Sequence, residues 1–356
     1  MADWARIANT TIREYIRDEE VNVLRNRKLT ERLRKRGRIT FNHGGDDMDW
    51  KVRFKRAPMF GYADTDTLTF SRVNRWKTAT LPWRGYASTD SMTKAERLKN
   101  KSTEAIIKVY DQIAKDLMED IEDQFGDEFY IDGNAAANSR RMHGLETMMA
   151  GATSGALAAA NAATYAGIDT TRGAFGGTWS GTWPGGTGPA HFDFWTPLIV
   201  SYTNSGWTAS TDTWPNTCVE ALRFGSIHSR KNKSTRGKLD LVFLENELYR
   251  QFLAQQEAKE NIYIVRGKSS DGDLEVGFGE STYFDGVEIT FEYGLPAGVG
   301  YGFNVDQMEL RSMQSQLFVP EGPDWDIASQ SWRFSIDFFG NCRFNPRYFV
   351  KWVPLN

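Results

Sequence analysis

One long amphipathic helix is predicted between Thr93 and Gln124, and this feature restricts the possible folds most strongly. Its apolar residues recur at spacings of three and four, so they line one helix face: Ile106, Val109, Ile113, Leu117, Ile121 and Phe125. Thr93 and Glu96 have the spacing of a capping box, and Gly126 is expected to stop the helix. At about 1.5 Å per residue the helix would be roughly 48 Å long. Such a helix is more typical of a beam in an extended molecule than of a compact enzyme; an ordinary long core helix is the alternative.

Composition narrows the class of protein. At 356 residues the chain is long enough for two or three domains with a sizeable core. It is 40% hydrophobic and 25% charged, as folded soluble proteins usually are. The two cysteines, Cys218 and Cys342, suggest neither a disulfide framework nor a zinc site. The sequence lacks a signal-peptide pattern and an apolar run of membrane length, so we expect a soluble protein made in a cytoplasm.

Residues 1–40 are predicted to form a charged arm. Thr10 and Thr11 are positioned to cap a helix, and Gly37 to end it. The arm has too few apolar residues to fold alone, so it should order against another surface; a solvated helix face is the alternative. Its second half is strongly basic, because residues 25–38 contain eight basic residues and a single acid, Glu31. The basic residues are Arg25, Arg27, Lys28, Arg32, Arg34, Lys35, Arg36 and Arg38.

Residues 41–92 are predicted to form a long β-hairpin. From Met48 to Lys55 apolar and charged residues alternate with a period of two, as in a half-buried strand. A second extended run follows from Thr67 to Gly85. An isolated two-stranded ribbon is marginally stable in water, so this one must lie on its own domain or on a neighbouring chain. The aromatic residues that we expect to be buried against a neighbour are Trp50, Phe54, Trp76 and Trp83.

The rest of the chain mixes helix and strand. Residues 150–190 are rich in Ala, Gly, Ser and Thr but keep several aromatic residues, which favours a loop or a small-residue helix over a linker. A helix around residues 219–227, a strand at 239–243 and a helix at 245–257 form a predicted α/β unit. The end is β-rich, with strands expected at 287–291, 332–338 and 348–353.

The sequence contains no convincing catalytic or cofactor site. Gly267-Lys268-Ser269 resembles the end of a phosphate loop but lacks the first glycine. His43 stands near three aspartates, yet carboxylates in a loop are usually just solvated. Five tryptophans within 36 residues could form a sugar-binding platform, although such residues more often anchor a core or an interface: Trp179, Trp183, Trp195, Trp207 and Trp214.

The long helix carries its charges against its own dipole. A helix dipole favours acids near the start and bases near the end, with a cost of some tenths of a kcal/mol for each misplaced charge. Complementary charge from elsewhere would relieve this, and the basic arm, from this chain or another, is the obvious source. The acids that we expect at such a contact are Asp116, Glu119, Asp120, Glu122 and Asp123.

The order of these parts resembles the major capsid protein of tailed bacteriophages, with the Hong Kong 97 fold. Four local sequences also look like that family's. They are Arg141-Met-His-Gly144-Leu-Glu after the long helix, Tyr165-Ala-Gly167-Ile-Asp169, Leu239-Asp-Leu-Val-Phe-Leu244 before Tyr249, and Tyr301-Gly-Phe-Asn304 through Leu310-Arg311. The resemblance covers most of the chain, and the order of the motifs carries it more than any one motif.

The resemblance implies an α+β fold and a structural role without catalysis. It implies an N-terminal arm at 1–40, an extended loop at 41–92, a peripheral domain at 93–149 and 285–356, and an axial domain at 150–284. It implies an icosahedral head shell assembled in the host cytoplasm around double-stranded DNA, with no cofactor, metal or membrane. The implied partners are further copies in pentamers and hexamers, a separate scaffolding protein, a portal protein, packaged DNA bound without sequence specificity and, optionally, a decoration protein.

Two other functions remain as alternatives. A nucleic-acid-binding protein would use the basic arm, but residues 25–38 contain no aromatic side chain to stack on bases. A carbohydrate-binding or carbohydrate-hydrolysing protein would use the tryptophans, and between Thr170 and Asp212 only Asp193 and Asp212 offer carboxylates for hydrolysis.

Overall fold

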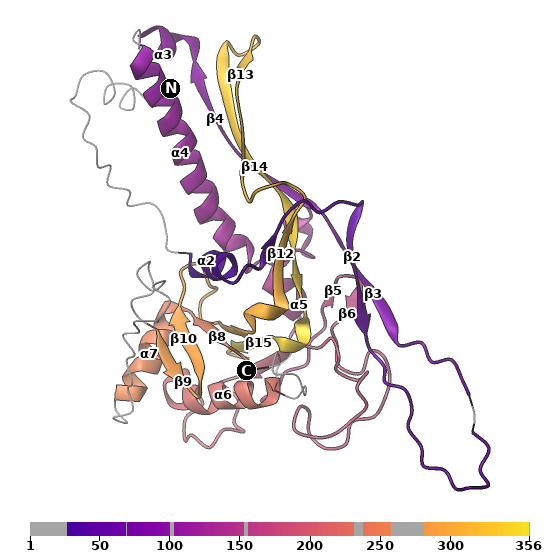
Figure 1. The fold of residues 1–356 in the computed structure, drawn as a ribbon. Helices are drawn as coiled ribbons and strands as arrows, with labels where there is room; N and C mark the ends of the chain where they lie inside the picture. Colours follow the sequence, from indigo (N-terminus) through magenta and orange to yellow (C-terminus); the bar gives the residue numbers. More distant parts are fainter. Residues whose placement is uncertain are drawn as a thin grey trace.

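The long helix is the spine of the molecule (Figure 1). The computed structural model describes residues 27–68, 70–99, 103–152, 156–230, 238–257 and 281–355. The predicted helix appears as α3 (Lys94–Lys99) and α4 (Thr103–Glu128), on either side of residues that the structure does not describe. The capping box is confirmed: the Thr93 amide donates to Glu96 Oε2 at 2.8 Å, and the Glu96 amide donates to Thr93 Oγ1 at 3.3 Å.

The predicted stop at Gly126 is wrong, because α4 continues to Glu128. Gly126 instead lies against the side chain of Arg27: a Cβ atom there would come within 2.8 Å of Arg27 Cγ. The predicted apolar face is confirmed where side chains are described, since Ile113, Leu117, Ile121 and Phe125 are buried. Ile106 and Val109 lie outside the described side chains.

A five-stranded sheet packs against α4. It contains β1 (Ile39–Thr40), β12 (Met308–Ser312), β14 (Ser331–Phe344) and β13 (Val319–Asp326) in that order, and β4 (Arg84–Thr93) also pairs with β14. Figure 1 shows β4, β13 and β14 rising beside the spine helix. β4 lies within the segment that the sequence assigns to the extended loop, yet its ten residues pair with β14 from Thr93↔Ser331 to Arg84↔Gly340.

A six-stranded sheet forms the other body of the molecule. Its order is β7 (Leu198–Ser201), β15 (Val350–Val353), β11 (Gly300–Phe303), β8 (Leu241–Leu244), β10 (Val287–Phe291) and β9 (Thr282–Phe284). Helices α6 (Trp214–Ser229) and α7 (Asn246–Glu257) pack on one face. The helix predicted at 245–257 and the strand at 287–291 are therefore confirmed. Strands β10, β11 and β15 of this sheet come from residues 285–356, the segment that the sequence assigns to the same domain as the spine. The chain therefore passes between the two bodies more often than the predicted domain boundaries imply.

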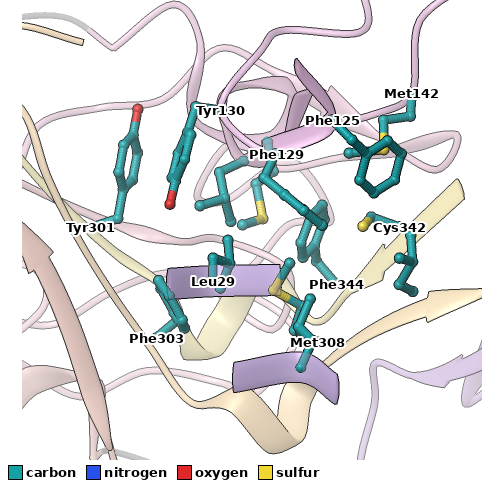
Figure 2. Packing of buried hydrophobic residues seen from close by; sticks show 14 of the residues in the cluster. Leu29, Phe125, Phe129, Tyr130, Met142, Tyr301, Phe303, Met308, Cys342 and Phe344 are labelled. Atoms are coloured by element: carbon teal, nitrogen blue, oxygen red, sulfur yellow. The ribbon is translucent and has the colours of Figure 1, made fainter. Parts of the chain in front are cut away.

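The two bodies share one hydrophobic core at their junction. Helix α2 (Lys28–Lys35) lies there, and its Leu29 and Leu33 are fully buried. Figure 2 shows Leu29 among Phe129 from the end of the spine, Phe303 of β11 and Met308 of β12. Gly37 ends α2 as predicted: its φ is +60°, and the Arg38 amide donates to the Leu33 carbonyl at 2.8 Å. The helix predicted to begin near Thr10 lies outside the described residues.

The remaining elements are short. A two-stranded ribbon of β2 (Asp47–Arg53) and β3 (Trp76–Pro82) projects to one side, and its connecting loop extends beyond it (Figure 1). In sequence, four short elements follow the spine and precede β7: η1 (Ala136–Asn138), α5 (Leu145–Met149), β5 (Thr164–Tyr165) and β6 (Ile168–Asp169). Two further 3-10 turns, η3 (Val305–Gln307) and η4 (Pro346–Tyr348), flank β12 and β15.

Candidate subunit-contact surfaces

The base of the ribbon rests on the chain's own surface. The Trp50 ring lies 6.4 Å from that of Tyr165, and the Phe54 ring lies 5.8 Å from that of Phe194. The Thr80 amide donates to the Ala166 carbonyl at 3.1 Å. The sequence pattern predicts a surface under this ribbon, and the structure places that surface within residues 165–195 of the same chain.

The four aromatic residues proposed for a neighbour therefore differ in their surroundings. Trp50 and Phe54 are partly buried inside the chain, and Trp83 donates its Nε1–H to the Gly45 carbonyl at 3.0 Å. Trp76 is the one of the four that stays largely exposed, at 55%. An aromatic contact between the ribbon and a neighbour consequently depends on Trp76 and on the loop beyond it.

The loop between β2 and β3 exposes a row of large apolar side chains. Met59 is 98% exposed and Phe70 is 91% exposed. Phe60, Tyr62 and Leu68 are exposed as well. Monomeric proteins rarely expose such a group, which marks an interaction surface. The sequence analysis missed these residues, although Met59-Phe60 and Tyr62 stand between turn-forming residues where a solvated loop would be polar.

Arg27 lies in a socket made by the end of the spine and the turn after β10. Its Nε contacts Asp123 Oδ1 at 2.9 Å, and its Nη1 contacts Asp127 Oδ1 at 2.8 Å. Nη1 also donates to the Tyr293 carbonyl at 2.8 Å. Gly126 on one side and Gly294 on the other leave room for the guanidinium, since a Cβ atom at either position would overlap it. This contact anchors the N-terminal end of α2.

The other basic residues of the segment also have partners within the chain. Lys28 Nζ donates to Thr290 Oγ1 at 2.9 Å and lies 3.8 Å above the Phe291 ring. The ion pairs are Arg32–Glu288, Arg34–Glu122 at 2.7 Å, Lys35–Glu31 at 3.0 Å, Arg36–Asp240 at 3.5 Å and Arg38–Asp306 at 3.4 Å. Arg25 lies outside the described residues.

The acidic part of the spine is thus partly covered by its own chain. Glu122 and Asp123 face Arg34 and Arg27. Asp116 accepts a hydrogen bond from Gln112 at 2.7 Å, and Glu119 lies 3.7 Å from Lys115. Asp120 is exposed to solvent. The spine charges are therefore compensated in part within one copy, and any contact that they make between copies stays a prediction.

Glu292 is a buried acid beneath α2, with 1% of its surface exposed. Burial raises its pKa to about 8, against the opposing effects of the Tyr130 hydroxyl and of Arg27 and Lys28. The folded chain therefore holds a proton that the unfolded chain, with an ordinary pKa of 4.5, releases. This contribution to stability is complete below the unfolded pKa and is lost as pH rises through the folded pKa.

We expect the free energy of unfolding to fall between about pH 5 and about pH 8, because in this range the unfolded chain releases the Glu292 proton and the folded chain retains it. Glu292→Gln should flatten this part of the profile, and Glu321→Gln on exposed β13 is the control. Urea unfolding across this pH range measures it. An unchanged slope in Glu292→Gln would contradict the assignment.

Four of the five clustered tryptophans are core anchors, and the fifth, Trp179, is half-buried with its ring 5.1 Å from that of Phe192. Trp183, Trp195, Trp207 and Trp214 are all buried. Each donates its Nε1–H within the chain: Trp183 to Asp193, Trp195 to the Tyr165 carbonyl, Trp207 to the Ser201 carbonyl and Trp214 to the Leu248 carbonyl. A sugar platform needs exposed ring faces, so these four rings do not provide one.

The described residues hold no group of three or more His, Cys, Asp or Glu side chains that could bind a metal ion. His43 lies 2.8 Å from Thr40 Oγ1. No helix in the described ranges is both long and apolar enough to cross a membrane. Gly267-Lys268-Ser269 falls outside the described residues.

Several solved structures with a similar fold come from phage or GTA capsids. The chain from the cyanophage A-1(L) capsid matches with a TM-score of 0.57 and 16% identity, over 98% of this chain and 99% of that one. A chain from the capsid of a native GTA particle matches with a TM-score of 0.54, 11% identity and coverage of 98% and 99%. A capsid chain of the Myoviridae phage XM1 matches with a TM-score of 0.51, 10% identity and coverage of 95% of each chain.

No protein-family model matches the sequence, and no curated protein matches it either. The structural likeness nevertheless extends over nearly the whole length of both chains. It establishes the fold, which is the α+β fold of phage capsid proteins of the Hong Kong 97 type, and the fold predicted from the sequence is confirmed.

Proposed function

We propose that this chain is a shell subunit, a major capsid protein whose copies form pentamers and hexamers and close into an icosahedral virion head around double-stranded DNA. The observation that carries the proposal is the match to a phage capsid chain over 98% of this chain and 99% of that one. An enzyme or a sugar-binding protein on this fold would need a site, and four of the five tryptophans proposed for one are buried.

The surface chemistry supports the same function. The loop after β2 presents Met59 and Phe70 to solvent, so a free copy carries apolar surface that a neighbour would cover. The exposed loop would meet a different surface on the next copy, so the contact would be heterologous. Such contacts make closed rings when the rotation closes.

The partners of this shell are part of the proposal. Pentamers and hexamers need further copies of the chain, and a closed head needs a portal protein through which DNA enters. We expect a separate scaffolding protein during assembly, DNA contacts without sequence specificity, and the virion head as the final location.

The direct test is to purify the protein, separate it by size and image it by negative-stain microscopy with and without a co-expressed scaffold. We expect closed shells, and particles that melt at a higher temperature than the free chain, because each contact stabilises the folded state by mass action. A chain that stays monomeric under all of these conditions and melts at one temperature is not a shell subunit.

The basic residues in and beside α2 lead to a second prediction. Replacing Arg32, Arg34, Lys35 and Arg36 by Glu turns four ion pairs into pairs of like charge. The acids that they pair with are Glu288, Glu122, Glu31 and Asp240. The more exposed pairs of Arg34 and Arg36 contribute about 0–1 kcal/mol each, so reversing either alone should matter little. The Arg32–Glu288 pair is largely buried, so its reversal should cost more, and the four reversals together should loosen α2. We expect a lower melting temperature and poor assembly even without DNA.

A charge-conserving variant (Arg32→Lys, Arg34→Lys, Lys35→Arg, Arg36→Lys) is the control for that experiment and should assemble much better. If the fourfold reversal instead forms normal empty shells and loses only packaged DNA, the segment acts through DNA.

A further inference from the structure

A groove of about 620 Å³ runs along β2, between the ribbon and the body of the chain. Residues 50–56 form one wall, and Phe194, Trp195, η3 and η4 contribute to the other. No residue of β3 lines it, so the groove follows one strand of the ribbon. Within the described residues β2 pairs with β3 alone, which leaves backbone N–H and C=O groups on its second edge.

The groove carries an excess of positive charge. Arg38 and Arg343, which line it, are paired with Asp306 and Glu309. The cations of the β2 wall have no ionic partner among the described residues: Lys51, Arg53, Lys55 and Arg56. Lys51, Arg53 and Lys55 alternate along an extended chain, so their side chains lie on one side with a repeat of about 6.6–6.8 Å.

Arg347 adds a buried cation to the wall of the groove. Its side chain is 4% exposed, and its Nη2 has no hydrogen-bond partner in the described part of the chain. The carboxylate nearest to Nη2 is that of Asp193, 3.9 Å away, whose Oδ2 already accepts the Nε1–H of Trp183 at 3.1 Å. A buried N–H group without an acceptor is costly, so an incoming hydrogen-bond acceptor would be favoured at Nη2.

One segment of the sequence has the complementary pattern. In residues 269–280, which the structure does not describe, three acids occupy alternate positions: Asp271, Asp273 and Glu275. If extended, they would repeat at the same spacing as the cations of β2. Elsewhere many acids are already paired with cations of their own chain, as Asp123 and Glu288 are.

The position of this segment in the fold favours a contact between copies. It lies in sequence between α7 and β9, and β9 is one edge of the six-stranded sheet. The ribbon packs on residues 165–195, which precede β7 at the opposite edge. Figure 1 shows α7 and β9 on one side of the molecule and the ribbon on the other. A head-to-tail contact would bring these two sides together.

We propose that residues 269–280 of one copy bind in the groove along β2 of a second copy, as an added strand whose Asp271, Asp273 and Glu275 face Lys51, Arg53 and Lys55. The inference rests on the proposed shell function and assigns one of its contacts. Backbone hydrogen bonds to the edge of β2 would supply affinity, and the alternating charges would set the register. On the wall opposite β2, Arg347 would donate from Nη2 to a backbone carbonyl of the bound segment.

A charge exchange tests the pairing. Changing Lys51, Arg53 and Lys55 to Glu, or Asp271, Asp273 and Glu275 to Lys, should each reduce particle yield by at least about tenfold, since every contact in the shell is affected. Both sets combined in one chain should restore most of the yield. Circular dichroism and melting of the free chain report whether each variant folds. A combined variant no better than either parent overturns the proposal.

A second measurement uses the unaltered chain. Particles assembled from mixed isotope-labelled and unlabelled copies are treated with a zero-length carbodiimide cross-linker and digested. We expect labelled-to-unlabelled links from Lys51 or Lys55 to Asp271, Asp273 or Glu275. Particles that form without such links overturn this contact and leave the shell function standing. Failure of the unaltered chain to form particles overturns both. Loss of packaged DNA alone in the Lys51, Arg53 and Lys55 variant assigns the groove to DNA and also overturns the proposal.

Discussion

Deleting Ala57–Phe70 is expected to leave a folded, soluble protein that no longer forms shells. The deleted segment contains the most exposed apolar side chains of the loop, Met59 and Phe70, and none of the residues that pair β2 with β3. Burying such a side chain on a neighbour is worth about 1.5–3 kcal/mol, and the gain recurs at every subunit contact. The free chain should lose almost nothing, because these side chains pack on none of its core.

Size separation, negative-stain imaging and melting of the free chain together measure this outcome. The paired substitution Met59→Ser and Phe70→Ser should reproduce most of the defect without shortening the chain. Ile227→Ser is the matched control, because Ile227 is 63% exposed but lies on α6, away from the loop. Normal particles from the deletion would show that the loop is not a subunit contact.

Phe125→Ala is expected to lower the free energy of unfolding of the free chain by about 3–5 kcal/mol. Phe125 is 2% exposed, and its ring meets four others: Phe338 at 4.7 Å, Phe129 at 5.4 Å, Phe318 at 5.6 Å and Tyr86 at 5.9 Å. Truncation removes these edge-to-face contacts and leaves a cavity between the spine and the five-stranded sheet.

Chemical unfolding of the free chain measures the loss. Leu98→Ala is the control, since Leu98 is 59% exposed on α3 and a surface change usually stays within about 0.5 kcal/mol. A loss below about 1.5 kcal/mol for Phe125→Ala would mean that the neighbouring rings close the cavity.

Much of the fold could be predicted because its signals are local. The period of the spine, the capping box at Thr93, the glycine that ends α2 and the strands at 287–291 and 332–338 depend on residues close together in sequence. Their order along the chain was enough for the resemblance to a capsid protein, and the fold is confirmed.

The remaining features depend on contacts between distant residues. Gly126 has the signature of a helix stop, but the side chain that requires a glycine there is that of Arg27, from another segment. Trp50 and Phe54 have the pattern of an interface strand, and nothing local indicates that Tyr165 and Phe194 of the same chain lie beneath them. The groove could not be predicted, because its walls come from segments as distant in sequence as Lys51 and Arg347.

The strand pairings also constrain when the chain can fold. Ile39 pairs with Leu310 in the five-stranded sheet, and Leu198 pairs with Val350 in the six-stranded sheet. Both are parallel pairings across long loops, whose closure is slow because the entropy is lost before the contacts form. A ribosome must therefore release nearly the whole chain before either sheet is complete. Folding is expected to follow synthesis, so open strand edges and apolar surface are exposed to chaperones before any copy can meet another.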